Sequence, residues 1–169
     1  MNKLMQYLGL ATLCAAAGCT TVQSSRDLPA VQNFDAAKYM GTWHEVARLP
    51  QWFERDLKDV TATYSLEKDS LRIVNRGTKN GKEKVATAVG HFAGDSDVGH
   101  FRISFFRPFY GDYKILWLSP GYDLSLVTGN DRSSLWLLSR NPNLPVEQRD
   151  ALIDMAKGMG FKVEELEFP

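Results

Sequence analysis

The sequence is poor in cysteine and carries no excess charge of either sign. Cys14 and Cys19 are the only two thiols among 169 residues, and 20 basic side chains balance 20 acidic ones. A chain without a basic surplus lacks the electrostatic attraction on which nucleic-acid binding depends, which argues against nucleic acid as a partner. The length is sufficient for one domain with its own hydrophobic core.

Sequence signatures of catalysis and of metal binding are also missing. No Gly-X-Ser-X-Gly motif occurs, and the acidic stretch 95–97 lacks the later glutamate of a calcium loop. His44, His91 and His100 do not have the spacing of a metal-binding pair on a helix, and only a hairpin would bring His91 and His100 together. We therefore expect no catalytic residue, no metal site, no cofactor and no enzymatic activity.

A long hydrophobic run is absent as well. The apolar stretch at residues 4–16 has about a dozen residues, whereas a transmembrane helix needs about 20. Lys3 precedes this stretch and small residues follow it, which is the composition of a secretory signal peptide. We therefore expect residues 1–18 to be removed from the exported protein.

The signal ends at a cysteine. Ala17, Gly18 and Cys19 resemble the end of a bacterial lipoprotein signal, although Ala16 stands where that signal has leucine. The resemblance implies that Cys19 becomes the acylated N-terminus of the mature protein. Thr20 follows in place of the aspartate that favours the inner membrane, so the resemblance implies a lipid-anchored protein of the bacterial outer membrane.

The scarcity of cysteine favours lipidation. Cys14 would leave with the signal, so Cys19 would have no disulfide partner in an oxidising compartment. The alternative is an ordinary cleaved signal followed by an incidental cysteine. Residues 19–33 lack periodicity and are expected to form the acylated N-terminus and a tether.

From Phe34 onward, turn-forming residues interrupt the chain every 8–14 residues. The intervening segments are rich in valine, isoleucine, threonine and aromatic residues, and several alternate between apolar and polar positions. These patterns predict eight β-strands, at about 42–49, 59–66, 70–77, 83–92, 100–106, 112–118, 122–129 and 134–140.

After the strands the hydrophobic period changes to that of a helix. Over residues 146–158 the pattern predicts a helix with Leu152, Met155, Ala156 and Met159 on one face, and a short final strand follows within 161–168. Eight strands joined by hairpins suit an all-β, antiparallel up-and-down barrel spanning residues 34–169. A β-sandwich is the alternative, but it more often needs long crossover connections, which are absent here.

The first strand carries a Gly-X-Trp motif at Gly41 and Trp43, and the eighth ends at Arg140. Together with eight strands and a trailing helix, these residues resemble the lipocalin family, and stretches such as "TWHEVARLP" resemble its bacterial outer-membrane branch. The middle family signature is met only loosely, at residues 121–123. The resemblance implies that Trp43 closes one end of the barrel beneath the guanidinium of Arg140.

Strand parity places loops 50–58, 78–83, 106–111 and 129–133 at the opposite, open end. Aromatic side chains gather on these loops, either as an apolar entrance or membrane-touching surface, or as rings that fold back to cap the barrel. Basic side chains on the same loops form either a rim for an anionic or zwitterionic head group or a solvated face. These basic residues are Arg55, Lys58, Lys79, Lys82, Arg107 and Arg132.

A barrel of eight strands is wide enough for one small ligand. Alternation along the strands and the parity of the loops together nominate pocket and mouth residues. The candidates are Trp52, Phe53, Tyr64, Ile73, Phe101, Ile103, Phe105, Phe106, Phe109, Tyr110, Tyr113, Ile115 and Trp117.

The lipocalin resemblance implies storage or transport of fatty acids or lysophospholipids for envelope maintenance, under stress. Its implied partners are a small hydrophobic ligand, the membrane through the N-terminal lipid, and a second copy in a homodimer. Two alternatives stay open. One is a membrane-anchored scaffold with a filled barrel that acts by protein contact, and the other is an enzyme acting on a small lipid.

Overall fold

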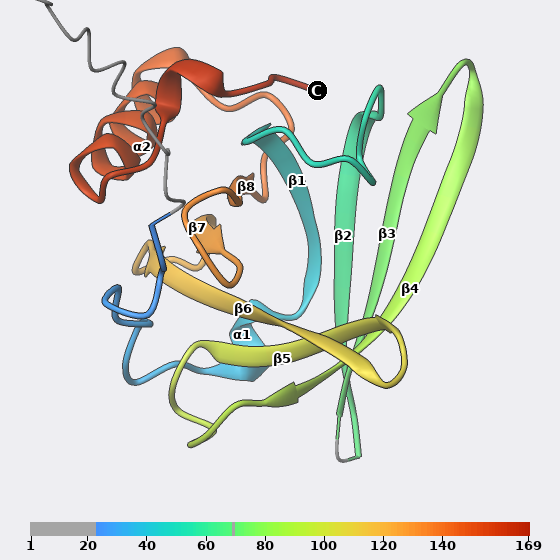
Figure 1. Ribbon diagram of the computed structural model, residues 1–169, viewed down its shortest axis with the longest axis vertical. Helices are drawn as coiled ribbons and strands as arrows, with labels where there is room; N and C mark the ends of the chain where they lie inside the picture. The colour runs from blue at the N-terminus through green and yellow to red at the C-terminus, as the bar shows by residue number, and fades with distance from the viewer. Residues whose placement is uncertain (1–22, 69) are drawn as a thin grey trace, which may run out of the picture.

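The computed structural model describes residues 23–68 and 70–169, so the predicted signal peptide and Cys19 lie outside the described residues. Eight antiparallel strands close into a barrel in which each strand pairs with its neighbour in sequence and β1 pairs with β8 (Figure 1). The elements are α1 (Ala36–Tyr39), β1 (Gly41–Arg48), β2 (Lys58–Glu67), β3 (Ser70–Lys79), β4 (Lys82–Phe92), β5 (His100–Phe106), β6 (Phe109–Leu118), β7 (Leu124–Thr128), β8 (Leu135–Ser139), α2 (Val146–Gly158) and η1 (Val163–Glu165).

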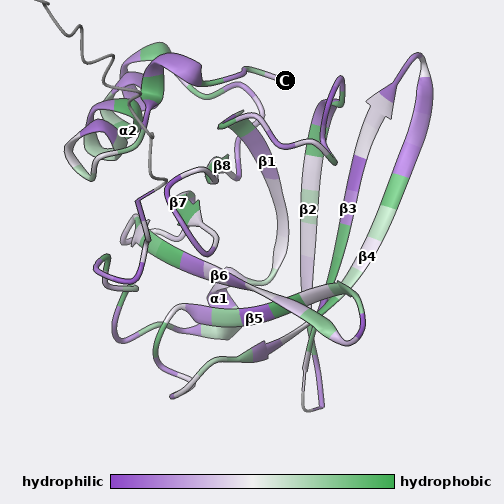
Figure 2. Cartoon of the chain, in the orientation of Figure 1, coloured by the Kyte–Doolittle hydropathy of each residue, from purple (hydrophilic) through white to green (hydrophobic). Residues whose placement is uncertain are grey.

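The strands form where apolar and polar residues alternate, because one face of each strand is buried inside the barrel. Figure 2 shows this alternation as successive hydrophobic and hydrophilic bands along β5. The long β3–β4 hairpin turns at Asn80 and Gly81, which both have a positive φ, as a two-residue hairpin turn requires. The predicted barrel and the predicted helix at 146–158 are both confirmed.

The closed end of the barrel is built around Trp43, which is fully buried. The guanidinium of Arg140 lies 4.0 Å from the centre of the indole ring, and the indole nitrogen donates a hydrogen bond to the carbonyl oxygen of Tyr39. Arg140 also donates to the carbonyl oxygens of Thr42 and Met40, at 2.8 and 2.7 Å. The stacking was predictable from the family motif, whereas the carbonyl contacts needed the folded backbone.

Gly41 adopts a φ of +97°, and a Cβ at this position would lie 3.2 Å from Nη1 of Arg140. Glycine takes this left-handed conformation without steric cost, and here it also leaves room for the guanidinium. Any larger residue at position 41 would therefore disturb the cation that covers Trp43.

Helix α2 lies outside the barrel, beside the β7–β8 side (Figure 1). Its Leu152 and Ala156 are buried in a second hydrophobic cluster, which includes Leu126, Leu135 and Leu137 from β7 and β8. Strands β7 and β8 are therefore buried on both faces. No helix in the described part of the chain is long and apolar enough to cross a membrane.

The predicted final strand is largely wrong. Residues 163–165 form the short 3₁₀ helix η1, and Glu167 pairs with a strand through two backbone hydrogen bonds to Arg48. The pairing of β1 with β2 covers only Gly41–His44, so β2 does not reach the backbone of Arg48. Glu167 pairs with Arg48 in its place.

Candidate ligand-binding site

A cavity of about 490 Å³ occupies the open half of the barrel. Its volume lies within the range of about 300–1,000 Å³ that is usual for small-molecule pockets. The apolar walls come from β2, β3, β5, β6 and β8 and from loop 50–58. Among the sequence-predicted candidates, Phe53, Tyr64, Ile73, Ile103, Phe105, Phe106, Phe109, Tyr110 and Tyr113 line this cavity.

The other four candidates lie elsewhere. Trp52 lines an adjoining groove, and Phe101 and Ile115 belong to the packed core rather than to the cavity wall. The prediction that Trp117 points into the barrel is wrong, since this residue packs with the cluster beneath α2. A β-bulge between Ile115 and Trp117 shifts the register with β7, so that residues two apart no longer share a face.

Three tyrosines meet at the inner end of the cavity. The hydroxyl of Tyr113 lies 2.8 Å from the hydroxyls of both Tyr39 and Tyr64. Burial raises the pKa of Tyr39 to about 12 and raises the pKa of Tyr64 and Tyr113 well above the usual value. All three tyrosines are therefore neutral at physiological pH, and this end of the cavity carries hydroxyl dipoles rather than charge.

A buried acid cluster lies on the β1 side of the cavity. Glu45 and Glu54 both line the cavity. Arg48 bonds to a carboxylate oxygen of Glu45 at 2.6 Å and to the backbone oxygen of Glu54 at 2.9 Å. The indole nitrogen of Trp136 donates to the Glu54 carboxylate at 3.0 Å, and the Glu167 carboxylate approaches the guanidinium to 3.2 Å.

The guanidinium of Arg48 faces the carboxyl groups of Glu45, Glu54 and Glu167. One positive charge does not balance three negative charges, so protonation of an acid in this cluster is favoured. Burial is the main cause that raises the pKa of Glu45, to about 8, with a further contribution from Glu54 against the opposing effect of Arg48. Burial likewise raises the pKa of Glu54. The alternation of β1 gave a signal for Glu45, which lies two positions after the buried Trp43. A bulge between Glu45 and Ala47 ends this alternation, and Ala47 packs in the cluster beneath α2.

The adjoining groove has a volume of about 510 Å³ and shares Phe53, Phe105 and Asn75 with the cavity lining. The two hollows therefore adjoin at the mouth but differ in charge. Among the residues that the structure describes, the charged side chains of the cavity wall are all acidic, whereas those of the groove are mostly basic. The cavity has Glu45, Glu54 and Asp112, and the groove has Arg55, Arg76, Lys79, Lys84 and Glu54.

The predicted basic rim is realised only in part. Arg55 and Lys79 line the groove, and Lys58, Lys82 and Arg107 are exposed. Arg132 does not belong to the rim, because it is only 8% exposed and forms an ion pair with Asp27. Strand parity correctly placed its loop, but it contained no information about the direction of the side chain.

The aromatic rings of the mouth do not fold back as a cap. Trp52 is 84% exposed, Phe106 82% and Phe109 78%. The Trp52 ring instead packs edge-on against Phe53, at 5.6 Å between centroids. Phe106 and Phe109 face each other across the β5–β6 turn. The mouth therefore presents large apolar surfaces to its surroundings.

The histidines suggested by the sequence do not assemble into a metal centre. Over residues 23–68 and 70–169, no group of three or more histidine, cysteine, aspartate or glutamate side chains is placed to hold a metal ion. His100 instead contacts Asp112, at 3.3 Å.

The comparisons with known proteins agree with the barrel fold. A family model described as a lipocalin-like domain matches residues 34–169. The chain belongs to the lipocalin family. It is 38% identical over 166 residues to outer membrane lipoprotein Blc of Escherichia coli K12, with 94% of each chain covered. It is 37% identical over 153 residues to outer membrane lipoprotein Blc of Vibrio cholerae, with 88% of each covered.

Solved structures support the fold of this lipocalin. Insecticyanin from the tobacco hornworm Manduca sexta superposes with a TM-score of 0.70 at 18% identity, covering 84% of this chain and 83% of that one. The bacterial relatives confirm the predicted lipocalin family and the predicted outer-membrane localisation. Lipocalins are typically non-enzymatic proteins that bind small hydrophobic ligands, and this chain is one of them by family.

Proposed function

We propose that this lipocalin stores or transports a single-chain lipid, a fatty acid or a lysophospholipid, for maintenance of the bacterial envelope. The observation that carries the proposal is the pairing of an apolar cavity inside the barrel with a basic groove at its mouth. The acyl tail enters the cavity, and the polar head stays at the groove.

Acylation of Cys19 is part of the same proposal. The small residues before this cysteine support it, as does the likeness to relatives that are themselves outer membrane lipoproteins. The acyl chains would hold the barrel at the membrane from which it takes, or to which it delivers, its lipid.

Electrostatics favours binding with the head group outward. A carboxylate or phosphate deep in the cavity would meet acidic side chains, Glu45, Glu54 and Asp112, and no lysine or arginine among the described residues of the cavity lining. At the groove the same head group meets guanidinium and ammonium groups. Asn75 lines both hollows and has a buried Oδ1 without a hydrogen-bond partner, so it offers an acceptor to an amine or hydroxyl of the head.

The expected affinity suits exchange rather than permanent storage. A tail that buries ~15 methylenes at ~0.8 kcal/mol each gains ~12 kcal/mol. Association costs at least ~4 kcal/mol, so the net binding free energy is about −8 kcal/mol, which corresponds to a Kd of about 1 µM.

Native mass spectrometry of the soluble barrel without its lipid anchor, residues 20–169, purified from cells without detergent, tests the proposal directly. We expect a co-purified fatty acid or lysophospholipid that excess palmitate or lysophosphatidylethanolamine displaces. Ala62 lines the cavity, and in Ala62→Trp the larger indole occupies part of the cavity volume. We therefore expect at least a tenfold loss of lipid binding. Ala151→Trp, on the exposed surface of α2, is the matched control and should bind normally.

A barrel that is purified without a ligand and binds neither lipid in titration would contradict the proposal. That outcome would favour the alternative of an anchored scaffold acting by protein contact.

A further inference from the structure

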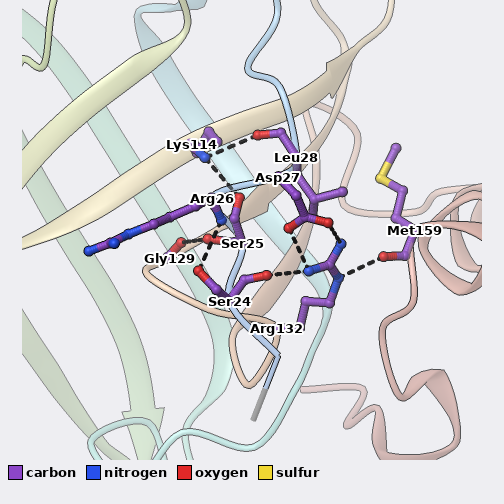
Figure 3. Close-up of polar contacts among 9 residues, drawn as sticks. All are labelled: Ser24, Ser25, Arg26, Asp27, Leu28, Lys114, Gly129, Arg132 and Met159. Atoms are coloured by element: carbon purple, nitrogen blue, oxygen red, sulfur yellow. Dashed lines mark hydrogen bonds and ion pairs between the residues drawn. The ribbon is translucent and has the colours of Figure 1, made fainter.

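The first described residues of the chain are fixed to the barrel rather than hanging free. This N-terminal strap, residues 23–28, runs along the β7–β8 loop, residues 129–133 (Figure 3). The backbone nitrogen of Arg132 donates to Gln23 at 2.9 Å, and the hydroxyl of Ser25 donates to the carbonyl oxygen of Gly129 at 2.8 Å. An isolated β-bridge joins residue 24 to residue 131.

Two buried cations hold the strap from its sides (Figure 3). Arg132 makes a two-pronged ion pair with Asp27, at 2.7 and 2.9 Å, and also bonds to the backbone oxygens of residues 24 and 159. The Lys114 ammonium donates to the backbone oxygens of Ser25 and Leu28, at 2.9 and 3.0 Å. Both cations are 8% exposed, so detaching the strap would leave two buried charges without these partners.

The loop that holds the strap belongs to the open end of the barrel. The Gln51 amide, beside Trp52, donates to the backbone oxygen of Ser133 at 2.9 Å. The backbone nitrogen of Asp112 donates to the Asn130 side chain at 2.7 Å. Loop 129–133 therefore contacts both loop 50–58 and the start of β6, and the strap begins beside the mouth of the cavity.

The distance from the strap to the predicted lipid anchor is short. Cys19 precedes Gln23 by four residues, and four residues reach at most about 14 Å even when fully extended. A ten-residue strand such as β2 is about 33 Å long, so the closed end lies much farther from the anchor. A membrane that holds acyl chains on Cys19 must therefore lie near the open end.

The open end also has the chemistry of a membrane-contacting surface. Trp52, Phe106 and Phe109 are exposed there, and tryptophan in particular favours the interface between acyl chains and head groups. Segments 50–58, 78–84 and 106–111 carry six basic side chains against three acidic ones. This basic surplus attracts the anionic phospholipids of a membrane surface. The basic residues are Arg55, Lys58, Lys79, Lys82, Lys84 and Arg107, and the acidic ones are Glu54, Asp56 and Glu83.

We infer that the open end of the barrel docks on the phospholipid leaflet that holds the acyl anchor, with Trp52, Phe106 and Phe109 inserted among the head groups. The strap fixes this orientation, and a lipid passes between leaflet and cavity without crossing water. The inference rests on the acylation of Cys19 proposed with the function.

Spin labels at the two ends of the barrel test the inference. The thiol of an acylated Cys19 is blocked, so a cysteine introduced into the mature chain is the single reactive site. Phe106→Cys places the label at the mouth, and Ser96→Cys, in the exposed closed-end loop 93–99, is the matched control. Each acylated chain is reconstituted into vesicles of phosphatidylethanolamine and phosphatidylglycerol.

We expect the label at position 106 to be at least fivefold more accessible to lipid-soluble oxygen than to an aqueous nickel complex, and the label at position 96 to show the reverse. A label at position 106 that is as water-accessible as the control would overturn the inference. Mass spectrometry of each chain reports the acyl groups, so failed acylation is distinguished from failed docking. Docking does not require a filled cavity, so its failure is also separate from a failure of lipid binding.

A second variant tests the role of the rings. With the label at Trp52→Cys, the added changes Phe106→Ser and Phe109→Ser should lower its oxygen accessibility at least threefold. Unchanged accessibility would show that the rings do not insert.

Discussion

At the scale of single residues, Arg140 joins parts of the chain that are far apart in sequence. Its guanidinium covers Trp43 at the closed end of the barrel. It also donates to the backbone oxygens of Lys38, Met40 and Tyr122. Desolvation lowers its pKa, although the group stays charged at physiological pH. The closed end therefore depends on one cation that satisfies several carbonyl groups.

Removal of this cation should weaken the fold. We expect Arg140→Ala to lower the free energy of unfolding by about 1–3 kcal/mol, through lost stacking and unpaired carbonyl groups. Urea unfolding measures the change. Arg72→Ala, an exposed position on β3, is the control and should change stability by less than about 0.5 kcal/mol. Equal effects of the two variants would mean that the contact with Trp43 contributes nothing.

Glu45 makes stability depend on pH. Its pKa is raised from 4.5 to about 8 in the fold, so the folded state holds the proton more tightly than the unfolded chain does. The associated stability is fully present below about pH 4.5 and is lost as pH rises to about 8.

Glu45→Gln should remove this dependence, because glutamine mimics the protonated acid. Between pH 5 and pH 8, the stability of the variant relative to the parent should rise by about 1–3 kcal/mol. Urea midpoints at the two pH values measure this difference. A constant difference across the range would show that Glu45 is ionised in the fold throughout.

At the scale of elements, the strands were predictable because alternation reflects burial on one face. The bulge at Ile115 and Trp117 was not, since a register shift follows from pairing with β7 and leaves no local pattern. The strap could not be predicted from the sequence either, because Arg132 and Lys114, which bind it, are far from it along the chain. The sequence identified most of the cavity wall but missed the acid cluster, since Glu54 comes from an irregular loop.

Helix α2 contributes to stability through a small buried face. Leu152 is 2% exposed and packs against the outer face of β7 and β8. We expect Leu152→Ala to lower the free energy of unfolding by about 2–4 kcal/mol. Val146→Ala, where the side chain is 53% exposed, is the matched control and should have a much smaller effect. Similar urea midpoints for both variants would indicate that α2 does not stabilise the barrel.

At the scale of the whole molecule, the lipid anchor decides where the barrel works. We expect Cys19→Ser to abolish labelling with radioactive palmitate and to release the protein into the periplasm. Fractionation of cells that express the two forms measures both effects. Persistent palmitate labelling of the variant would refute acylation at Cys19. The homodimer implied by the family resemblance stays a prediction, and sedimentation of the acyl-free variant would test it.

The pairing of β1 with β8 has a consequence for biogenesis. Ser139 must be available before the sheet can close on His44, and the bridge from Glu167 to Arg48 needs nearly the last residue of the chain. A polypeptide that threads through a translocation channel N-terminus first therefore cannot complete its barrel while its C-terminal part is still inside. The topology itself keeps the barrel from closing until transport is almost finished.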